Sequence, residues 1–110
     1  MTLPNSKAAY VPDAKLFAYL LSPSHPEGGP KSEFFAAVGY PIENAEALRQ
    51  EFLRIARSEE VVDEISFVFG VKYVVEGILA RAGGEGIPIR TIWVIDKGET
   101  APRFVSAYPL

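Results

Sequence analysis

The first half of the chain places its apolar residues at helical spacing. This pattern predicts three helices, over residues 14–21, 30–39 and 44–58. Asp13 would cap the first helix and Pro23 would stop it. The second begins at a proline and is followed by a glycine, and an asparagine caps the third. A buried strand over residues 14–21 is the competing interpretation, because a short apolar run fits either structure.

The second half changes to alternating, β-branched and aromatic sequence, which is typical of strands. Four runs have this character: 65–69, 71–81, 87–96 and 103–108. Gly70 would kink or bulge the strand that contains the first two runs. Residues 82–86 and 97–100 predict turns, and residues 58–64 predict a short turn or helix before the first strand.

The order of these elements predicts the fold class. Helices followed by an antiparallel meander argue for an α+β fold, with two to three N-terminal helices packed on a three- or four-stranded sheet. Residues 1–12, which carry two prolines, form an extended N-terminal arm in this prediction. Residues 13–110 form a single domain, as expected for a chain of 110 residues.

Alternation also predicts which strand residues share a face of the sheet. A loop over residues 82–86 would pair Arg81 with Ile87. If the next loop spans residues 97–101, Phe104 joins the polar face, and a shift of one residue reverses that outcome. The other face is mostly apolar and would receive the helices. The polar residues expected on one common face are Glu76, Arg90, Ser106 and Tyr108.

Composition narrows the function classes. Hydrophobic residues make up 48% of the chain, enough for a folded core, and the net charge of −3 means that nucleic-acid binding would need a local basic pocket. There is no cysteine, and the single histidine forms no metal-ligand pattern with other residues, so no metal or other cofactor is expected. Neither a signal peptide nor a membrane-spanning run is evident. We therefore expect a cytoplasmic protein without membrane contact.

The segment 22–31 carries the clearest candidate chemistry. It holds His25, whose ordinary pKa suits acid–base catalysis, and it ends in a glycine pair, a proline and Lys31. A helix beginning here would present backbone N–H groups to an anion, and Lys31 would add a positive charge. The alternatives are a solvent-exposed loop histidine and an ordinary surface lysine.

Three residues of the predicted sheet complete the candidate set. Arg90 lies in an otherwise apolar strand and needs an anionic partner, either a ligand phosphate or carboxylate or the carboxylate of Glu76. Ser106 and Tyr108 lie near the end of the chain among apolar residues. Tyr108 could equally be a core residue with a hydrogen-bonded hydroxyl.

Motifs spread over residues 13–109 resemble a small bacterial domain family of unknown function, found alone or at the C-termini of toxin- or phage-associated proteins. The motifs are Lys15-Leu16, Tyr19-Leu20-Leu21, Ser22-Pro23 with His25-Pro26, Gly29 with Lys31 and Phe34-Phe35, Phe69-Gly70-Val71-Lys72-Tyr73, Glu76-Gly77, Arg90-Thr91-Ile92-Trp93, and Pro102-Arg103-Phe104-Val105-Ser106-Ala107-Tyr108-Pro109.

The closing Ser106-Ala107-Tyr108-Pro109 also resembles toxin nucleases of the barnase–EndoU–colicin–RelE-like class. The resemblance implies metal-independent RNA cleavage, with His25 as the acid–base group, Lys31 and Arg90 stabilising the charge, and Ser106 or Tyr108 orienting the phosphate. It also implies RNA or another phosphate-bearing ligand, and an immunity-type protein, as partners. The alternatives are a non-catalytic binding or interaction domain with a small anion pocket, and a module that forms homodimers through a sheet edge.

Overall fold

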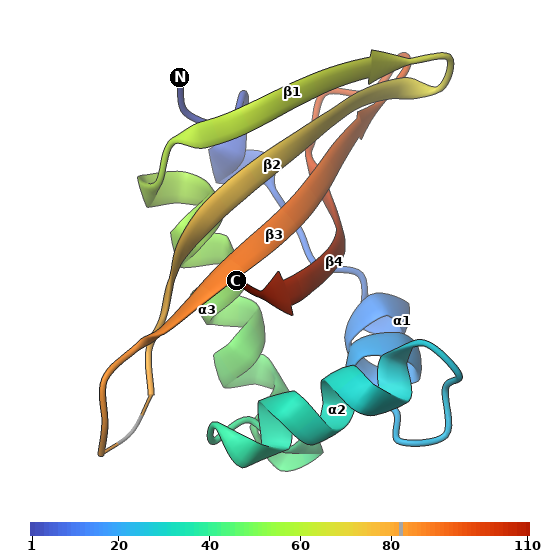
Figure 1. Ribbon diagram of the computed structural model, residues 1–110. Coiled ribbons are helices and arrows are strands. Elements are labelled where there is room, and N and C mark those ends of the chain that lie inside the picture. The colour runs from blue at the N-terminus through green and yellow to red at the C-terminus, as the bar shows by residue number, and fades with distance from the viewer. Residues whose placement is uncertain (82) are drawn as a thin grey trace.

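Helices precede a four-stranded antiparallel sheet in the computed structural model, which describes residues 1–81 and 83–110 (Figure 1). The strands are hydrogen-bonded in the order β1-β2-β3-β4, as in a meander. The expected α+β class is confirmed. The elements are η1 (Ser6–Ala8), α1 (Asp13–Lys15), η2 (Leu16–Leu20), α2 (Gly28–Ala37), η3 (Ile42–Asn44), α3 (Ala45–Ser58), β1 (Val61–Phe67), β2 (Gly70–Leu79), β3 (Ile87–Asp96) and β4 (Arg103–Pro109).

The helices lie where their apolar spacing predicts them. The first is helical rather than a strand, although only α1 is α-helical, and η2 continues it as a π-helix. Helix α2 begins two residues before the expected proline at 30. It ends before Gly39, whose φ of 105° lies in the left-handed region that favours glycine.

Strand β1 occupies residues for which a turn or helix is expected, so that part of the prediction for 58–64 is wrong. The run expected as one strand with a kink at Gly70 is instead two strands, with a tight turn at Val68 and Phe69 between them. Strand β1 lies at the sheet edge, and nearly all of its residues are exposed. Residues 65–67 of β1 lie in the strand run that was expected, whereas residues 61–64 show no apolar alternation from which a strand could be predicted.

The β2–β3 pairing differs from the predicted register by two residues. Leu79, rather than Arg81, lies opposite Ile87. A two-residue shift keeps every side chain on its predicted face, so Glu76 and Arg90 are still cross-strand neighbours. The loop expected over 82–86 falls between these strands, but its first residue, Ala82, lies outside the described residues.

A β-bulge in β4 decides which residues reach the polar face. Phe104 lies opposite Trp93 and Ser106 opposite Ile92, which leaves Val105 as an extra residue in β4. Ser106 and Tyr108 therefore share the face of Arg90, as predicted. Phe104 does not, because the bulge turns it onto the opposite, apolar face.

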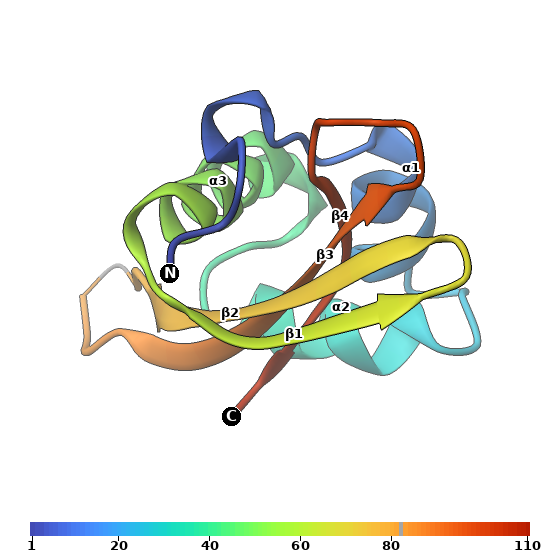
Figure 2. The same cartoon turned by 90° about the horizontal axis from the view of Figure 1, so that it is seen from above.

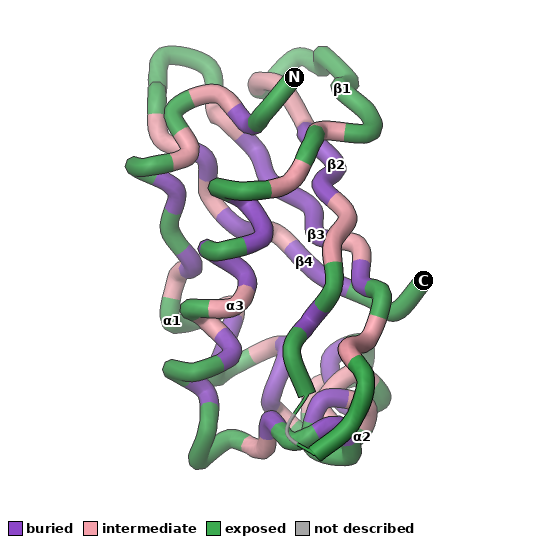
Figure 3. Tube along the Cα trace, turned by 90° about the vertical axis from the view of Figure 1, so that its left-hand side faces the viewer, coloured by how far each residue is buried: buried purple, intermediate pink, exposed green. Residues whose placement is uncertain are grey.

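The main core lies between this apolar face and α3 (Figures 1 and 2). The rings of Phe52 and Phe104 stack at 4.7 Å, and the Trp93 ring meets Phe104 edge-on. Along α3, Leu48 and Ile55 are fully buried. Figure 3 shows the buried positions concentrated on the inner side of α3 and along the central strands, whereas β1 is largely exposed.

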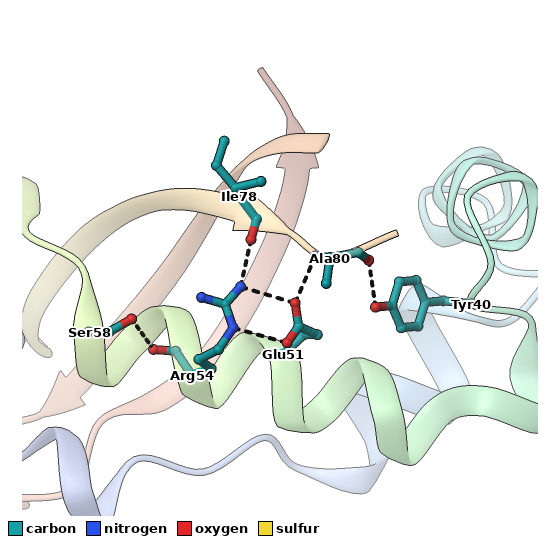
Figure 4. A network of polar contacts seen from close by, with 6 residues as sticks. All are labelled: Tyr40, Glu51, Arg54, Ser58, Ile78 and Ala80. Atoms are coloured by element: carbon teal, nitrogen blue, oxygen red, sulfur yellow. Dashed lines mark hydrogen bonds and ion pairs between the residues drawn. The ribbon is translucent and has the colours of Figure 1, made fainter. Parts of the chain in front are cut away.

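Polar contacts fasten α3 to the end of β2 (Figure 4). The Glu51 carboxylate accepts hydrogen bonds from the Arg54 guanidinium and from the backbone N–H of Ala80 at 2.8 Å. Arg54 also donates to the carbonyl of Ile78, and the Tyr40 hydroxyl donates to the carbonyl of Ala80. These bonds satisfy backbone groups just where the ladder between β2 and β3 ends.

The N-terminal segment 1–12 packs against the domain along its length. Leu3 and Val11 are buried in the core, and Tyr10 forms a parallel bridge with Arg103. Thr2 forms an antiparallel bridge with Glu60. None of the helices formed by residues 1–81 and 83–110 has the length and apolar character needed to cross a bilayer.

Candidate functional site

Three polar side chains from distant parts of the sequence meet beside β4. The Lys31 ammonium group donates to the Tyr19 hydroxyl at 2.9 Å and to the Ser106 hydroxyl at 2.7 Å. The two hydroxyl oxygens lie 3.1 Å apart. Tyr19 comes from η2, Lys31 from α2 and Ser106 from β4. Within the described residues, two of the three N–H groups of Lys31 have partners, which leaves the third for a ligand.

The backbone near Tyr19 is built for close contact between η2 and α2. The N–H of Leu21 donates to the carbonyl of Leu16, a π-helical bond, and such segments occur often at functional sites. The start of α2 packs directly on η2, since a Cβ added at Gly28 would lie 1.7 Å from the carbonyl oxygen of Tyr19. Gly28 thus allows the two helices to approach, and this brings Lys31 to Tyr19.

His25 serves first as a cap for α2. Its Nδ1 accepts hydrogen bonds from the backbone N–H groups of Glu27 at 3.0 Å and Gly28 at 2.9 Å. Its carbonyl accepts from the N–H of Gly29. The helix start is therefore not the open anion site expected from sequence, because His25 already occupies these N–H groups. With Nδ1 as an acceptor, the proton of the neutral ring is on Nε2.

A pocket of about 480 Å³ adjoins this cluster. The His25 ring meets the Tyr19 ring edge-on at 4.9 Å, and both residues line the pocket. The Lys15 ammonium group lies 5.4 Å from the centre of the Tyr19 ring. The lining combines cationic, hydroxyl and acidic groups from four segments: Ala14, Lys15, Ala18, Tyr19, His25, Glu27, Val105 and Ser106.

The Tyr19 phenol has an altered acidity. Burial by itself would raise its pKa, but the hydrogen bonds with Lys31 and Ser106 and the charge of Lys31 outweigh that effect. The net result is a pKa below the ordinary value of 10.0, despite an opposing contribution from the nearby Glu27 carboxylate.

Tyr108 also contacts Lys31, and Arg90 lies next to Tyr108 in the sheet. The Lys31 ammonium group is 4.7 Å from the centre of the Tyr108 ring, a cation–π contact. Arg90 is the cross-strand neighbour of Tyr108, but its guanidinium pairs with Glu76, at 2.8 Å from Nε to the carboxylate. It lines a different pocket, together with Val62, Asp63, Val74 and Glu76. The structure therefore brings together four of the five candidate residues: His25, Lys31, Ser106 and Tyr108. Arg90 lies beside this group and pairs with Glu76, one of the two anionic partners expected from the sequence.

Tyr19 is the member of this cluster that the sequence analysis did not include among the candidate site residues. It lies between Leu16 and Leu20 in an apolar run, where a tyrosine is expected to be a core residue. Tyr19 follows Lys15 by four residues, so the two side chains lie on one face of a helix. This spacing was the one indication in the sequence that Tyr19 could lie beside a cationic group. Across the described residues, no group of three or more His, Cys, Asp or Glu side chains is arranged to hold a metal ion.

The family model of a domain of unknown function, DUF6883, matches residues 2–110. The chain belongs to the DUF6883 family. None of the curated proteins matches this DUF6883 chain.

A solved structure shares the fold of this DUF6883 domain. It is described as a contact-dependent growth inhibition toxin–immunity protein complex from Klebsiella pneumoniae 342. The TM-score is 0.72 at 15% sequence identity, and the match covers 92% of this chain and 99% of that one. At this identity the likeness shows a common fold, over essentially the whole of both chains.

Proposed function

We propose that this DUF6883 domain is a toxin-like ribonuclease whose site holds the scissile phosphate at Lys31. The observation that carries the proposal is the Lys31 ammonium group between the Tyr19 and Ser106 hydroxyls, beside the pocket that His25 lines. One cation and two hydroxyl groups held at hydrogen-bond distance suit a phosphodiester, which carries one negative charge and several acceptor oxygens.

RNA supplies its own nucleophile, so the site needs no further reactant. The ribose 2′-oxygen forms a bond to phosphorus, the bond between phosphorus and O5′ breaks, and the products are a 2′,3′-cyclic phosphate and a 5′-hydroxyl. Lys31 stabilises the negative charge that develops on the phosphate oxygens. Ser106 and the Nε2–H of His25 orient those oxygens by donating hydrogen bonds.

The remaining predicted residues act at the edge of the site. Tyr108 holds Lys31 in place through its ring, 4.7 Å from the ammonium group. Arg90 binds a neighbouring phosphate of the RNA chain, with Glu76 released from its guanidinium when the phosphate arrives. Because the chain is acidic overall, binding would depend on this local group of cations rather than on the net charge.

A toxin-like role finds support in the shared fold, since the solved neighbour is a toxin–immunity complex. We extend the proposal to an immunity-type partner that would cover the pocket. Homodimers are a weaker prospect, because antiparallel pairing of two β1 edges would bring Asp63 and Glu64 of both chains together.

The test is incubation of the purified protein with total RNA, without added divalent cation and with EDTA. We expect cleavage with cyclic-phosphate ends, lost in Lys31→Ala and retained in the matched control Lys97→Ala, whose lysine lies in the turn between β3 and β4. Expression of the wild-type chain in a bacterium should arrest growth, and Lys31→Ala should relieve the arrest.

Intact RNA under all these conditions would refute the ribonuclease. If the protein then still bound an RNA oligonucleotide in a Lys31-dependent way, the same pocket would belong to a non-catalytic binding domain. Equal cleavage by wild type and Lys31→Ala would point to a contaminating nuclease.

A further inference from the structure

We infer that Tyr19, and not His25, takes the proton from the attacking 2′-hydroxyl. This inference rests on the proposed ribonuclease function and assigns the proton transfer within that same site. It departs from the sequence-based expectation, which gave the acid–base role to the only histidine. The hydrogen bonds of the two residues lead to the opposite assignment.

The acceptor nitrogen of His25 is not free for the substrate. Its Nδ1 carries the only lone pair of the neutral ring that can accept a proton, and that lone pair already accepts from Glu27 and Gly28. Protonation at Nδ1 would set an N–H group against two backbone N–H donors and break the cap of α2. The neutral ring can still donate from Nε2, so His25 is a positioning residue.

Tyr19 has the surroundings that a proton-transfer residue needs. Its hydroxyl oxygen accepts from the Lys31 ammonium group at 2.9 Å, so a phenolate there has an adjacent positive charge. The lowered pKa of Tyr19 is consistent with this arrangement. The other charged groups around the ring are Lys15 on its own helix, 5.4 Å from the ring centre, and Glu27 in the following turn. The phenol also lines the pocket, where a substrate can reach it.

Tyr19 and Lys31 together account for every proton that is transferred in the reaction. The reactive form is the one in which the Tyr19 phenol has lost its proton to solvent. The 2′-hydroxyl proton passes to this phenolate as the 2′-oxygen bonds to phosphorus. The electron pair of the broken bond leaves with O5′, which takes a proton from the Lys31 ammonium group. The Tyr19 phenol then returns a proton to the Lys31 amine across 2.9 Å, and this restores the phenolate and the ammonium ion.

The first test compares Tyr19→Phe with Tyr10→Phe on a single-stranded RNA oligonucleotide. The first variant keeps the ring and removes only the hydroxyl, and Tyr10 is an exposed tyrosine of the N-terminal segment. We expect Tyr19→Phe to lower kcat by about 100-fold or more, the usual contribution of a positioned acid or base, and Tyr10→Phe to leave kcat unchanged. Thermal melts of both variants check that each is folded.

The second test separates proton transfer from positioning through the pH dependence of kcat/KM. Placing 3-fluorotyrosine at position 19 makes the phenol more acidic, so the alkaline rise of kcat/KM should move to lower pH. His25→Asn keeps an acceptor at the position of Nδ1 and removes Nε2. It should weaken substrate binding and leave the midpoint of that rise where it is.

Two results would overturn this inference and leave the ribonuclease proposal intact. The first is cleavage by Tyr19→Phe at a rate within a few-fold of wild type. The second is a midpoint of the alkaline rise of kcat/KM that shifts in His25→Asn and does not shift when Tyr19 is fluorinated. A wild-type protein that cleaves no RNA would overturn the ribonuclease and, with it, this assignment.

Discussion

The ammonium nitrogen of Lys31 lies 2.7 Å from the hydroxyl oxygen of Ser106, although 75 positions separate the two residues in the chain. Two local features make this contact. Gly28 lets α2 approach η2, and the bulge at Val105 turns Ser106 away from the apolar core face. A polar cluster is thereby formed beside the core.

The acidity of Tyr19 should depend on Lys31. In wild type, the hydrogen bonds with Lys31 and Ser106 hold the pKa of Tyr19 below 10.0 against the effect of burial. In Lys31→Met the effects of burial and of the Glu27 charge remain, so the pKa should rise above that of wild type. Titration of the Tyr19 ¹³Cζ resonance measures it. An unchanged pKa would mean that the Lys31–Tyr19 bond is not formed in solution.

Loss of the cap at His25 should destabilise the domain without a general loss of structure. His25→Ala leaves the N–H groups of Glu27 and Gly28 without their acceptor, which should cost about 1 kcal/mol. His25→Asn places an oxygen where Nδ1 was and should recover most of that loss. Urea unfolding of the three proteins gives the comparison, and an equal loss in both variants would show that capping is not the role of Nδ1.

Gly28→Ala should be severely destabilising. A Cβ there would lie 1.7 Å from the carbonyl oxygen of Tyr19, so η2 and α2 must separate, at a cost of at least about 3 kcal/mol. Gly84→Ala is the matched control, because its Cβ would make only ordinary contacts, at 3.6 Å, with the Arg81 side chain. Its unfolding free energy should stay within about 0.5 kcal/mol of wild type. Comparable melting temperatures for the two variants would contradict the close packing.

The hydrogen bonds of Glu51 with Arg54 and with the Ala80 N–H should make the stability of the domain depend on pH. The hydrogen bonds from Arg54, followed by that from the Ala80 N–H, lower the pKa of Glu51 from its ordinary value of 4.5 against the effect of burial. A lowered folded-state pKa contributes stability that is fully present above pH 4.5 and is lost as the pH falls through the folded value. Glu51→Gln should therefore be less stable than wild type by about 1 to 2 kcal/mol at pH 7.

The difference between wild type and Glu51→Gln should shrink as the pH is lowered below 4.5 and the wild-type carboxylate becomes protonated. Chemical unfolding at a series of pH values from 7 to 2 measures it. A constant difference across this range would show that the charge of Glu51 does not contribute through these bonds.

Several elements of the fold could be predicted because their signals are local. Strand β3 has the predicted bounds, since its β-branched and aromatic residues stand between two turns. Helix α3 follows the spacing of Leu48, Phe52 and Ile55. The first half of strand β1, residues 61–64, escaped prediction because it pairs through its backbone at an exposed edge, and backbone pairing leaves little trace in side-chain pattern.

The site was predicted only in part, for a different reason. His25 and Lys31 stood out as rare or oddly placed residues, and Ser106 and Tyr108 through the resemblance of the chain's closing residues. The only signal for Tyr19 in the local pattern was its four-residue spacing from Lys15, which is weak because an aromatic residue in an apolar run is expected in a core.

By itself, the sequence determined the α+β class, the order of helices and strands, and which face of β3 is apolar, since these follow from periodicities a few residues long. Only the tertiary structure decided the sheet register, the bulge at Val105 and the meeting of Tyr19 with Lys31 and Ser106. Those features depend on contacts between residues far apart in the chain. The packing of several segments together sets the geometry of such contacts, and no single segment encodes it.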